Sequence, residues 1–156
     1  MELLANLGLG FSTAITPGNL LYCLAGVFLG TLIGVLPGLG PTATIAMLLP
    51  LTFTLPPVSA LIMLAGIYYG SQYGGSTTSI LINVPGEAGS VVTTLDGYQM
   101  ARQGRAGAAL GISAFGSFIA GTVGVVGLMF LAPLLGRAAL SFGPPEYFAL
   151  TLLGIT

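Results

Sequence analysis

The chain has 156 residues, of which 54% are hydrophobic and only 4% are charged, and its formal net charge is −1. An ordinary soluble domain carries roughly 25% charged residues, so this composition excludes a water-soluble surface and predicts that the protein folds in a lipid bilayer. The sequence has no histidine, no lysine and one cysteine. These absences exclude the usual zinc sites, activated nucleophiles and nucleotide-binding lysines, and the lack of a basic face argues against nucleic-acid binding. We therefore expect a membrane protein that is not an enzyme.

The first strongly apolar stretch covers residues 20–36 and predicts a helix close to the ~20 residues needed to cross the hydrocarbon. Glycine recurs within it at every fourth position, as Gly26, Gly30 and Gly34. This spacing strips one helical face to backbone and predicts close contact with a second helix. The preceding residues begin with an acid and lack lysine and arginine, which argues against a cleavable signal peptide.

The next segment is interrupted by proline and glycine at Pro37, Gly38, Gly40 and Pro41. A proline clashes with the carbonyl four residues back, so the first helix is predicted to end near Pro37, and a short helix to begin at Pro41. That helix, over residues 42–49, is too short to cross the membrane. We predict a discontinuous or re-entrant half-helix, with its positive N-terminal end directed into the fold.

Residues 58–84 predict another apolar helix, which we expect to break at Gly74-Gly75. Polar residues follow the expected break before Pro85-Gly86 ends the segment and presents Glu87; they are Ser76, Thr77, Thr78, Ser79 and Asn83. Main chain opened at membrane depth must be buried in protein or line a wet cavity, because lipid cannot hydrogen-bond to it. A broken, hydroxyl-rich helix therefore predicts a solute site.

Several of these residues also have a purely structural interpretation. The hydroxyls of residues 76–78 can satisfy carbonyls of their own helix, the tyrosines at 68, 69 and 73 can be packing residues, and Glu87 can be a boundary residue in water. The two Pro-Gly steps, Pro37-Gly38 and Pro85-Gly86, favour the functional interpretation. Paired breaks in hydrophobic segments are expected at transporter binding sites.

A hydrophilic connection over residues 90–105 separates these segments from the rest. Asp96, with Gln99 three residues later, resembles a capping box and predicts a short helix that Gly104 ends; cation or proton handling by Asp96 is the alternative. Residues 107–135 predict a full span. The apolar segment 147–156 is half the length of a span, so we expect the chain to be the N-terminal part of a longer polytopic protein.

Four stretches together resemble a known family: GVLPGLGPTATIAMLLPLTF, GIYYGSQYGGSTTSILINVPGE, TTLDGYQMARQGRAGAAL and FGPPEYFAL. They are similar, in order, to the N-terminal portion of the large membrane subunit of tripartite tricarboxylate transporters, the TctA-type family. The resemblance runs from about Gly34 to Leu150. It implies an all-α, multi-pass protein of the bacterial inner membrane. It also points to Gly38, Gly40, Pro41 and residues 69–87 as positions of the transport path.

The resemblance implies cation-coupled uptake of carboxylates such as citrate, with Na⁺ or H⁺ as the coupling ion and no other cofactor. It implies two partners, a periplasmic solute-binding protein and a small membrane subunit. Two alternatives remain open: a non-transporting membrane scaffold or assembly module, in which glycines and hydroxyls only pack helices, and a passive channel.

Resemblance and residue chemistry combine in one hypothesis about the site. No lysine or arginine lies in the polar stretch, so the N-terminal ends of half-helices after Gly40 and after Gly75 would bind the substrate carboxylates. The predicted substrate-binding residues are Gly38, Gly40, Pro41, Thr42, Thr44, Gly75, Ser76, Thr77 and Thr78. The predicted cation-coupling residues are Asn83 and Glu87, because hard cations prefer oxygen ligands.

Overall fold

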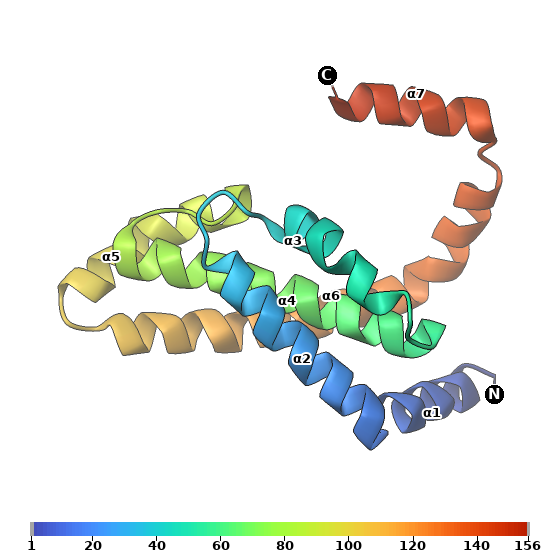
Figure 1. Ribbon diagram of the computed structural model, residues 1–156, viewed down its shortest axis with the longest axis horizontal. Coiled ribbons are helices and arrows are strands. Elements are labelled where there is room, and N and C mark those ends of the chain that lie inside the picture. The colour runs from blue at the N-terminus through green and yellow to red at the C-terminus, as the bar shows by residue number, and fades with distance from the viewer. Residues whose placement is uncertain (1, 156) are drawn as a thin grey trace. The chain divides into compact units, whose positions relative to one another are not determined.

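The computed structural model describes residues 2–155, except for the side chains of residues 2–4, 133, 138, 154 and 155 (Figure 1). These residues form helices and connecting loops with no strand, which confirms the predicted all-α class. The elements are α1 (Glu2–Ala14), α2 (Pro17–Gly34), α3 (Pro41–Leu48), η1 (Leu49–Thr52), α4 (Pro57–Ile82), η2 (Ala88–Ser90), α5 (Val91–Arg102), α6 (Ala106–Leu140) and α7 (Pro144–Ile155). The chain divides into two compact units, residues 1–114 and 115–156, and the predicted site residues all lie in the first.

Helices α2 and α4 contact each other through glycine, as Figure 1 shows where they cross. A Cβ atom added at Gly30 would lie 2.8 Å from Cα of Ile67, and one added at Gly66 would lie 2.6 Å from the carbonyl oxygen of Cys23. One added at Gly74 would lie 2.7 Å from the carbonyl oxygen of Thr31. These separations leave no room for any side chain. The close helix–helix contact predicted from the glycine spacing is therefore confirmed.

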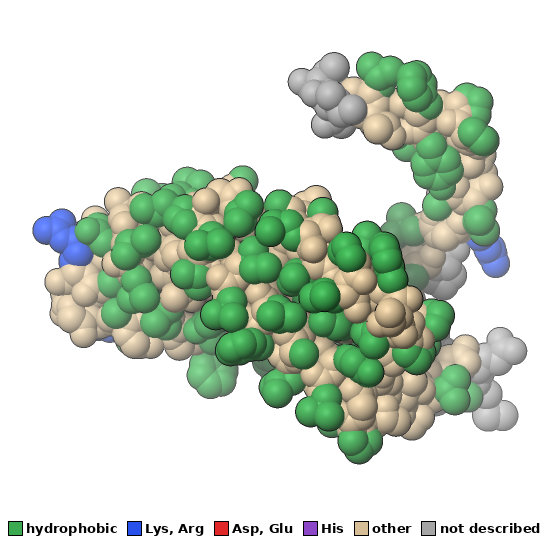
Figure 2. Space-filling model, viewed as in Figure 1, with side chains coloured by type: hydrophobic (Ala, Val, Ile, Leu, Met, Phe, Trp, Pro, Cys, Tyr) green, Lys and Arg blue, Asp and Glu red, His purple; other side chains and the backbone are tan. Residues whose placement is uncertain are grey.

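The distribution of side chains is the reverse of that in a soluble protein. Few hydrophobic residues of the described chain are buried: Met63, Ile67, Ile80 and Ala109. Glycine, serine and threonine instead occupy much of the α2–α4 contact. Large apolar side chains lie outside, and Figure 2 shows them spread over the visible face of α2, α3 and α4. Two helical segments, Pro17–Gly34 and Ala106–Ala132, are long and apolar enough to cross a membrane. A surface of this kind is matched to lipid.

The interruption after α2 is present as predicted. Helix α2 ends at Gly34, a turn with Gly38 at φ +85° follows, and α3 begins at Pro41. Eight residues of α-helix are about 12 Å long, which is well short of the ~30 Å hydrocarbon core. Helix α3 is therefore a short helix that packs on α4.

Helix α4, in contrast, is continuous from Pro57 to Ile82, so the predicted break at Gly74-Gly75 and the second half-helix after it are wrong. Packing requires the first of the two glycines, and the second lies in ordinary contact with the loop that follows the helix. Gly74 lies against the end of α2, and a Cβ atom at Gly75 would lie 3.4 Å from Cα of Gly86. The helix ends at Asn83, whose φ of +60° is the left-handed conformation that asparagine tolerates better than most residues.

Helix α5 starts earlier than expected. It begins at Val91, directly after η2, so Asp96 lies in the middle of the helix and its predicted capping role is wrong. A capping box lies one turn earlier, at the start of η2: the Glu87 N–H donates to Oγ of Ser90 at 3.2 Å, and the Glu87 side chain accepts from the Ser90 N–H. Ser90 is also the N-cap of α5, where it makes no side-chain cap bond. The predicted end is confirmed by Gly104, which has a φ of +77°.

The second unit contains most of α6, which extends for 35 residues, and α7. The N–H of Gly143 donates to Oε2 of Glu146 at 2.8 Å. This bond caps the first turn of α7 in the manner of an acidic residue at a helix N-terminus.

Candidate functional site

The two Pro-Gly loops meet in space. The N–H of Gly38 donates a hydrogen bond to the carbonyl oxygen of Gly86 at 3.2 Å, although one loop follows α2 and the other follows α4. Gly86 also lies against the main chain of Gly75, and a Cβ atom added to it would lie 3.2 Å from the carbonyl oxygen of Gly34. We call residues 37–40 and 85–87 the Pro-Gly junction. The pairing of the two breaks is thus a three-dimensional contact.

The N-terminus of α3 opens at this junction. Its N-cap is Gly40, which has no side chain to cap the helix, and Pro41 at the first helical position has no N–H. The N–H of Thr44 bonds to the carbonyl oxygen of Gly40 at 3.1 Å. The N–H groups of Thr42 and Ala43 are therefore the ones that lack a partner within the helix, and Thr42 is exposed. They form the positive end of a short helix dipole.

Thr44, one of the predicted substrate-binding residues, makes structural contacts beneath α3. Its side chain is fully buried, and its Oγ1 lies 3.1 Å from Oγ of Ser71 and 3.1 Å from the carbonyl oxygen of Gly40. These contacts attach α3 to α4. Ser71 was not predicted as a site residue, although its position next to Gly70 on the glycine face of α4 is a signal that it points toward neighbouring helices.

The hydroxyls of the C-terminal half of α4 bond to carbonyls of the same helix. Oγ1 of Thr77 donates to Tyr73 at 2.9 Å, and Oγ1 of Thr78 donates to Gly75 at 3.0 Å. Ser79 also donates to the carbonyl of Gly75, at 2.8 Å. This arrangement is the structural interpretation considered for these hydroxyls, because their protons are already used. Ser76 is half-buried on the same helix.

Glu87 lies at the centre of the junction. Its Cβ would be 3.7 Å from a Cβ atom at Gly40, and its Cγ would be 3.7 Å from one at Gly75, so two glycines border its side chain. The side chain is half-buried, and this burial raises the pKa of the carboxyl above its ordinary value. Asn83, the other predicted cation ligand, is exposed at the start of the same loop.

Gln72 contacts this carboxyl; it lies within the transport-path range 69–87 but is not among the predicted binding or coupling residues. With its amide nitrogen directed at Glu87, it donates to Oε1 and, at 3.2 Å, to Oε2, while its amide oxygen accepts from the Tyr68 hydroxyl at 3.2 Å. The one available signal was its spacing, because Gln72 follows Tyr68 by four residues and shares its helix face.

The structure thus gathers part of the predicted set and separates the rest. The residues gathered around the junction are Gly38, Gly40, Pro41, Gly75 and Glu87. Thr44 is buried beneath α3, and the hydroxyls of Thr77 and Thr78 bond within α4. Because α4 is unbroken, residues 76–78 offer no helix N-terminus to an anion.

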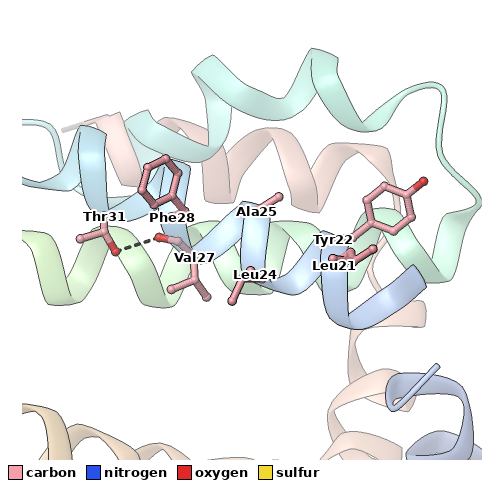
Figure 3. Close-up of a pocket in the computed structure, with 7 residues that line it drawn as sticks. All are labelled: Leu21, Tyr22, Leu24, Ala25, Val27, Phe28 and Thr31. Atoms are coloured by element: carbon pink, nitrogen blue, oxygen red, sulfur yellow. Dashed lines mark hydrogen bonds between the residues drawn. The ribbon is translucent and has the colours of Figure 1, made fainter. Parts of the chain in front are cut away.

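Two cavities lie away from the junction. One of about 740 Å³ lies along α2 and is lined by Leu21, Tyr22, Leu24, Ala25, Val27, Phe28 and Thr31 (Figure 3). The Thr31 hydroxyl bonds to the carbonyl of Val27 at 2.7 Å, and Tyr22 adds a second hydroxyl to the lining. A second, of about 300 Å³, is lined by residues of α4, α5 and α6, including Asp96.

Among the described residues no three His, Cys, Asp or Glu side chains form a metal-binding group.

Comparisons with known proteins agree with these observations. Residues 20–156 match the family described as "Tripartite tricarboxylate transporter TctA family". A curated relative from Agrobacterium vitis, described as "Uncharacterized 52.8 kDa protein in TAR-I ttuC' 3'region", is 66% identical over 155 residues. That alignment covers 99% of this chain and 31% of the relative, so the chain spans less than a third of the relative's length. No solved structure matches the chain. From the family match over residues 20–156 we conclude that the chain belongs to the tripartite tricarboxylate transporter TctA family.

Proposed function

We propose that this chain is the N-terminal part of the large permease subunit of a tripartite system that takes up tricarboxylates or related carboxylates across the bacterial inner membrane. In this proposal a periplasmic solute-binding protein delivers the substrate, and a small membrane subunit completes a multi-pass complex. Family membership and the outward-facing apolar surface support the proposal. The observation that carries it is the Pro-Gly junction, where the uncapped start of α3 meets the loop of Glu87.

The start of α3 would bind one substrate carboxylate. The N–H groups of Thr42 and Ala43 are free of helical partners, and the helix end behaves as roughly half a positive charge. No lysine or arginine lies in the junction, so these groups and the Thr42 hydroxyl are the available donors. Gly38 and Gly40 leave room for an anion to approach the main chain.

Glu87 gives this scheme a reason for ion coupling. Its Cβ lies next to Gly40, so an ionised carboxylate here would repel a substrate carboxylate at the start of α3. Protonation of Glu87, or a Na⁺ bound by Glu87, Asn83 and loop carbonyls, would remove that repulsion. Burial raises the pKa of this carboxyl because it favours the neutral form, which is the form that does not repel the substrate. The re-entrant position of α3 in the membrane is part of the same proposal.

A second candidate function is a non-transporting scaffold that assembles other subunits. The hydroxyls of Thr77 and Thr78, which bond to their own helix, and the glycine contact between α2 and α4 favour it, because both are packing features. Such a scaffold would depend on the glycines and would be insensitive to changes at Thr42 and Glu87.

Uptake of labelled citrate tests the proposal directly. Membrane vesicles would contain the complete large subunit with both partners, in the presence or absence of a Na⁺ gradient and of a pH gradient. Saturable uptake that requires one of the gradients and is weakened by Glu87→Gln supports the proposal. Flux that neither saturates nor responds to a gradient would identify a passive channel, and no uptake of any carboxylate would favour the scaffold.

A further inference from the structure

We propose that Gln72 is a positioning residue for Glu87: its amide bridges the Tyr68 hydroxyl and the Glu87 carboxylate and holds that carboxylate at the Pro-Gly junction. The inference rests on the proposed function only in giving Glu87 a role in coupling. Its structural content is the line of contacts from Tyr68 through Gln72 to Glu87, all within residues 1–114. Of these three residues, only Glu87 is among the predicted binding and coupling residues.

The position of Gln72 on α4 allows its amide to reach the Glu87 carboxylate. It lies on α4 one turn before Gly75, and the Glu87 stem lies against that glycine, because a Cβ atom there would be 3.7 Å from Cγ of Glu87. The carboxylate then lies next to the Gln72 amide, which can donate to both of its oxygens. The ionised carboxylate can only accept, so it fixes which end of the amide faces Glu87, and the amide oxygen of Gln72 then accepts from the Tyr68 hydroxyl.

The main chain of Glu87 is fixed from the other side. Its N–H donates to Oγ of Ser90 at 3.2 Å, and the Ser90 hydroxyl donates to the Glu87 carbonyl oxygen at 2.9 Å. Glu87 is thus the N-cap of η2, with its backbone and its side chain both in the capping box, and its side chain also contacts Gln72 of α4. Gln72 supplies the polar contact from α4.

This contact has a definite electrostatic effect. Burial favours the neutral carboxyl, and within residues 2–155 no charged side chain contributes to the raised pKa of Glu87. The titratable group that lies beyond Gln72 on α4 is the Tyr68 hydroxyl. Gly40 and Gly75 border the Glu87 side chain, and the Ser90 N–H donates to it in the capping box. A neutral donor such as the Gln72 amide stabilises the ionised form and partly offsets burial. Removing the donor should therefore raise the pKa of Glu87 further.

Labelling with dicyclohexylcarbodiimide measures this without requiring transport, because the reagent modifies protonated carboxyl groups in apolar surroundings. Membranes containing the complete subunit with its partners are treated across a pH series, and modification of the Glu87 peptide is followed by mass spectrometry. We expect Gln72→Met to move the labelling midpoint upward by about one pH unit, as expected for the loss of a hydrogen bond to a charged group. Tyr68→Phe should move it in the same direction by less.

Matched controls separate positioning from general disturbance. Tyr69 touches Tyr68 edge to face, with ring centroids 5.8 Å apart, and Gln99 is an exposed glutamine on α5. Tyr69→Phe and Gln99→Met should leave the Glu87 midpoint unchanged. If Gln72→Met does not accumulate in the membrane, Gln72→Glu keeps the shape and should raise the midpoint more strongly through like-charge repulsion.

The outcomes distinguish this inference from the proposed function. A midpoint for Gln72→Met equal to that of the wild type, or equal shifts in the Gln99 control, overturns the positioning role even if Glu87→Gln abolishes coupled uptake. A shifted midpoint together with unimpaired, gradient-driven uptake in Glu87→Gln supports the positioning role and contradicts the coupling role of Glu87.

Discussion

The N–H of Gly38 bonds to the carbonyl oxygen of Gly86, and through this bond the loop that follows α2 is held against the loop that follows α4. The contact is possible because Gly86 has no side chain and lies directly on the main chain of Gly75. The junction therefore depends on residues that carry no functional group themselves. They decide how close Glu87 comes to the start of α3.

Replacing Gly86 by alanine should destabilise the first unit. The added Cβ would overlap Cα of Gly75 and lie 3.2 Å from the carbonyl oxygen of Gly34, and both neighbours are backbone that cannot rotate away. Overpacking of this kind costs about 1–3 kcal/mol or more. Gly40→Ala is the control, because its Cβ would meet only the Glu87 side chain at 3.7 Å. Thermal unfolding in detergent should show a lower midpoint for Gly86→Ala alone, and equal midpoints would contradict the geometry.

The α2–α4 contact makes a similar prediction at Gly70. Its Cβ would overlap the carbonyl oxygen of Val27 and lie 2.9 Å from the N of Thr31, so Gly70→Ala should force the helices apart and lower the folded yield in the membrane. Gly18→Ala is the comparison, because nothing lies within 4 Å of that position. Wild-type yield and stability for Gly70→Ala would mean that the two helices are not in glycine contact.

The buried hydroxyl pair Thr44–Ser71 should contribute to the docking of α3. A double-mutant cycle with Thr44→Val and Ser71→Ala is expected to show a coupling of about 0.5–1.5 kcal/mol, as measured for neutral hydrogen bonds. Either single change leaves one buried hydroxyl without this partner, so each should cost more than the second change made afterwards. Strict additivity in unfolding measurements would place the two hydroxyls out of contact.

Glu87 should make stability depend on pH in a defined direction. Because burial raises the pKa of this carboxyl in the folded protein, its stabilising contribution is complete below the pKa of the unfolded chain and is lost as the pH rises through the folded pKa. Glu87→Gln imitates the protonated form at every pH. We therefore expect the wild-type melting temperature to fall relative to this variant as the pH increases from acidic to neutral. A difference between the two proteins that is constant with pH would show that the pKa of Glu87 is not raised.

Valine at Thr77 and Thr78 distinguishes binding hydroxyls from structural ones. The sequence alone predicts that losing them raises the KM for substrate, whereas their hydrogen bonds to Tyr73 and Gly75 indicate that the protons are not free for a ligand. We expect uptake with an unchanged KM. An increase in KM at constant kcat would restore both hydroxyls to the binding site.

The features that the sequence predicted correctly depend on local sterics. Pro37 and Pro41 end one helix and begin the next whatever surrounds them, and the glycine period of α2 marks a contact face by itself. The error at Gly74-Gly75 arose because two consecutive glycines can open a helix or admit a neighbour. The choice depends on Gly34 and Gly86, which approach only after folding. The same is true of Gln72, whose partner lies beyond the end of its own helix.

The glycine contact between α2 and α4 also limits how this protein can move. Main chain meets main chain at Gly30, Gly66 and Gly74, so sliding either helix along the other by one residue would drive a side chain into a carbonyl. Two helices in backbone contact have a single packing arrangement, because there are no side chains between them that could change rotamer and let one helix shift along the other. We expect α2 and α4 to travel as a single rigid body, so that any alternation between inward-open and outward-open shapes would have its hinges in the loops that flank α3.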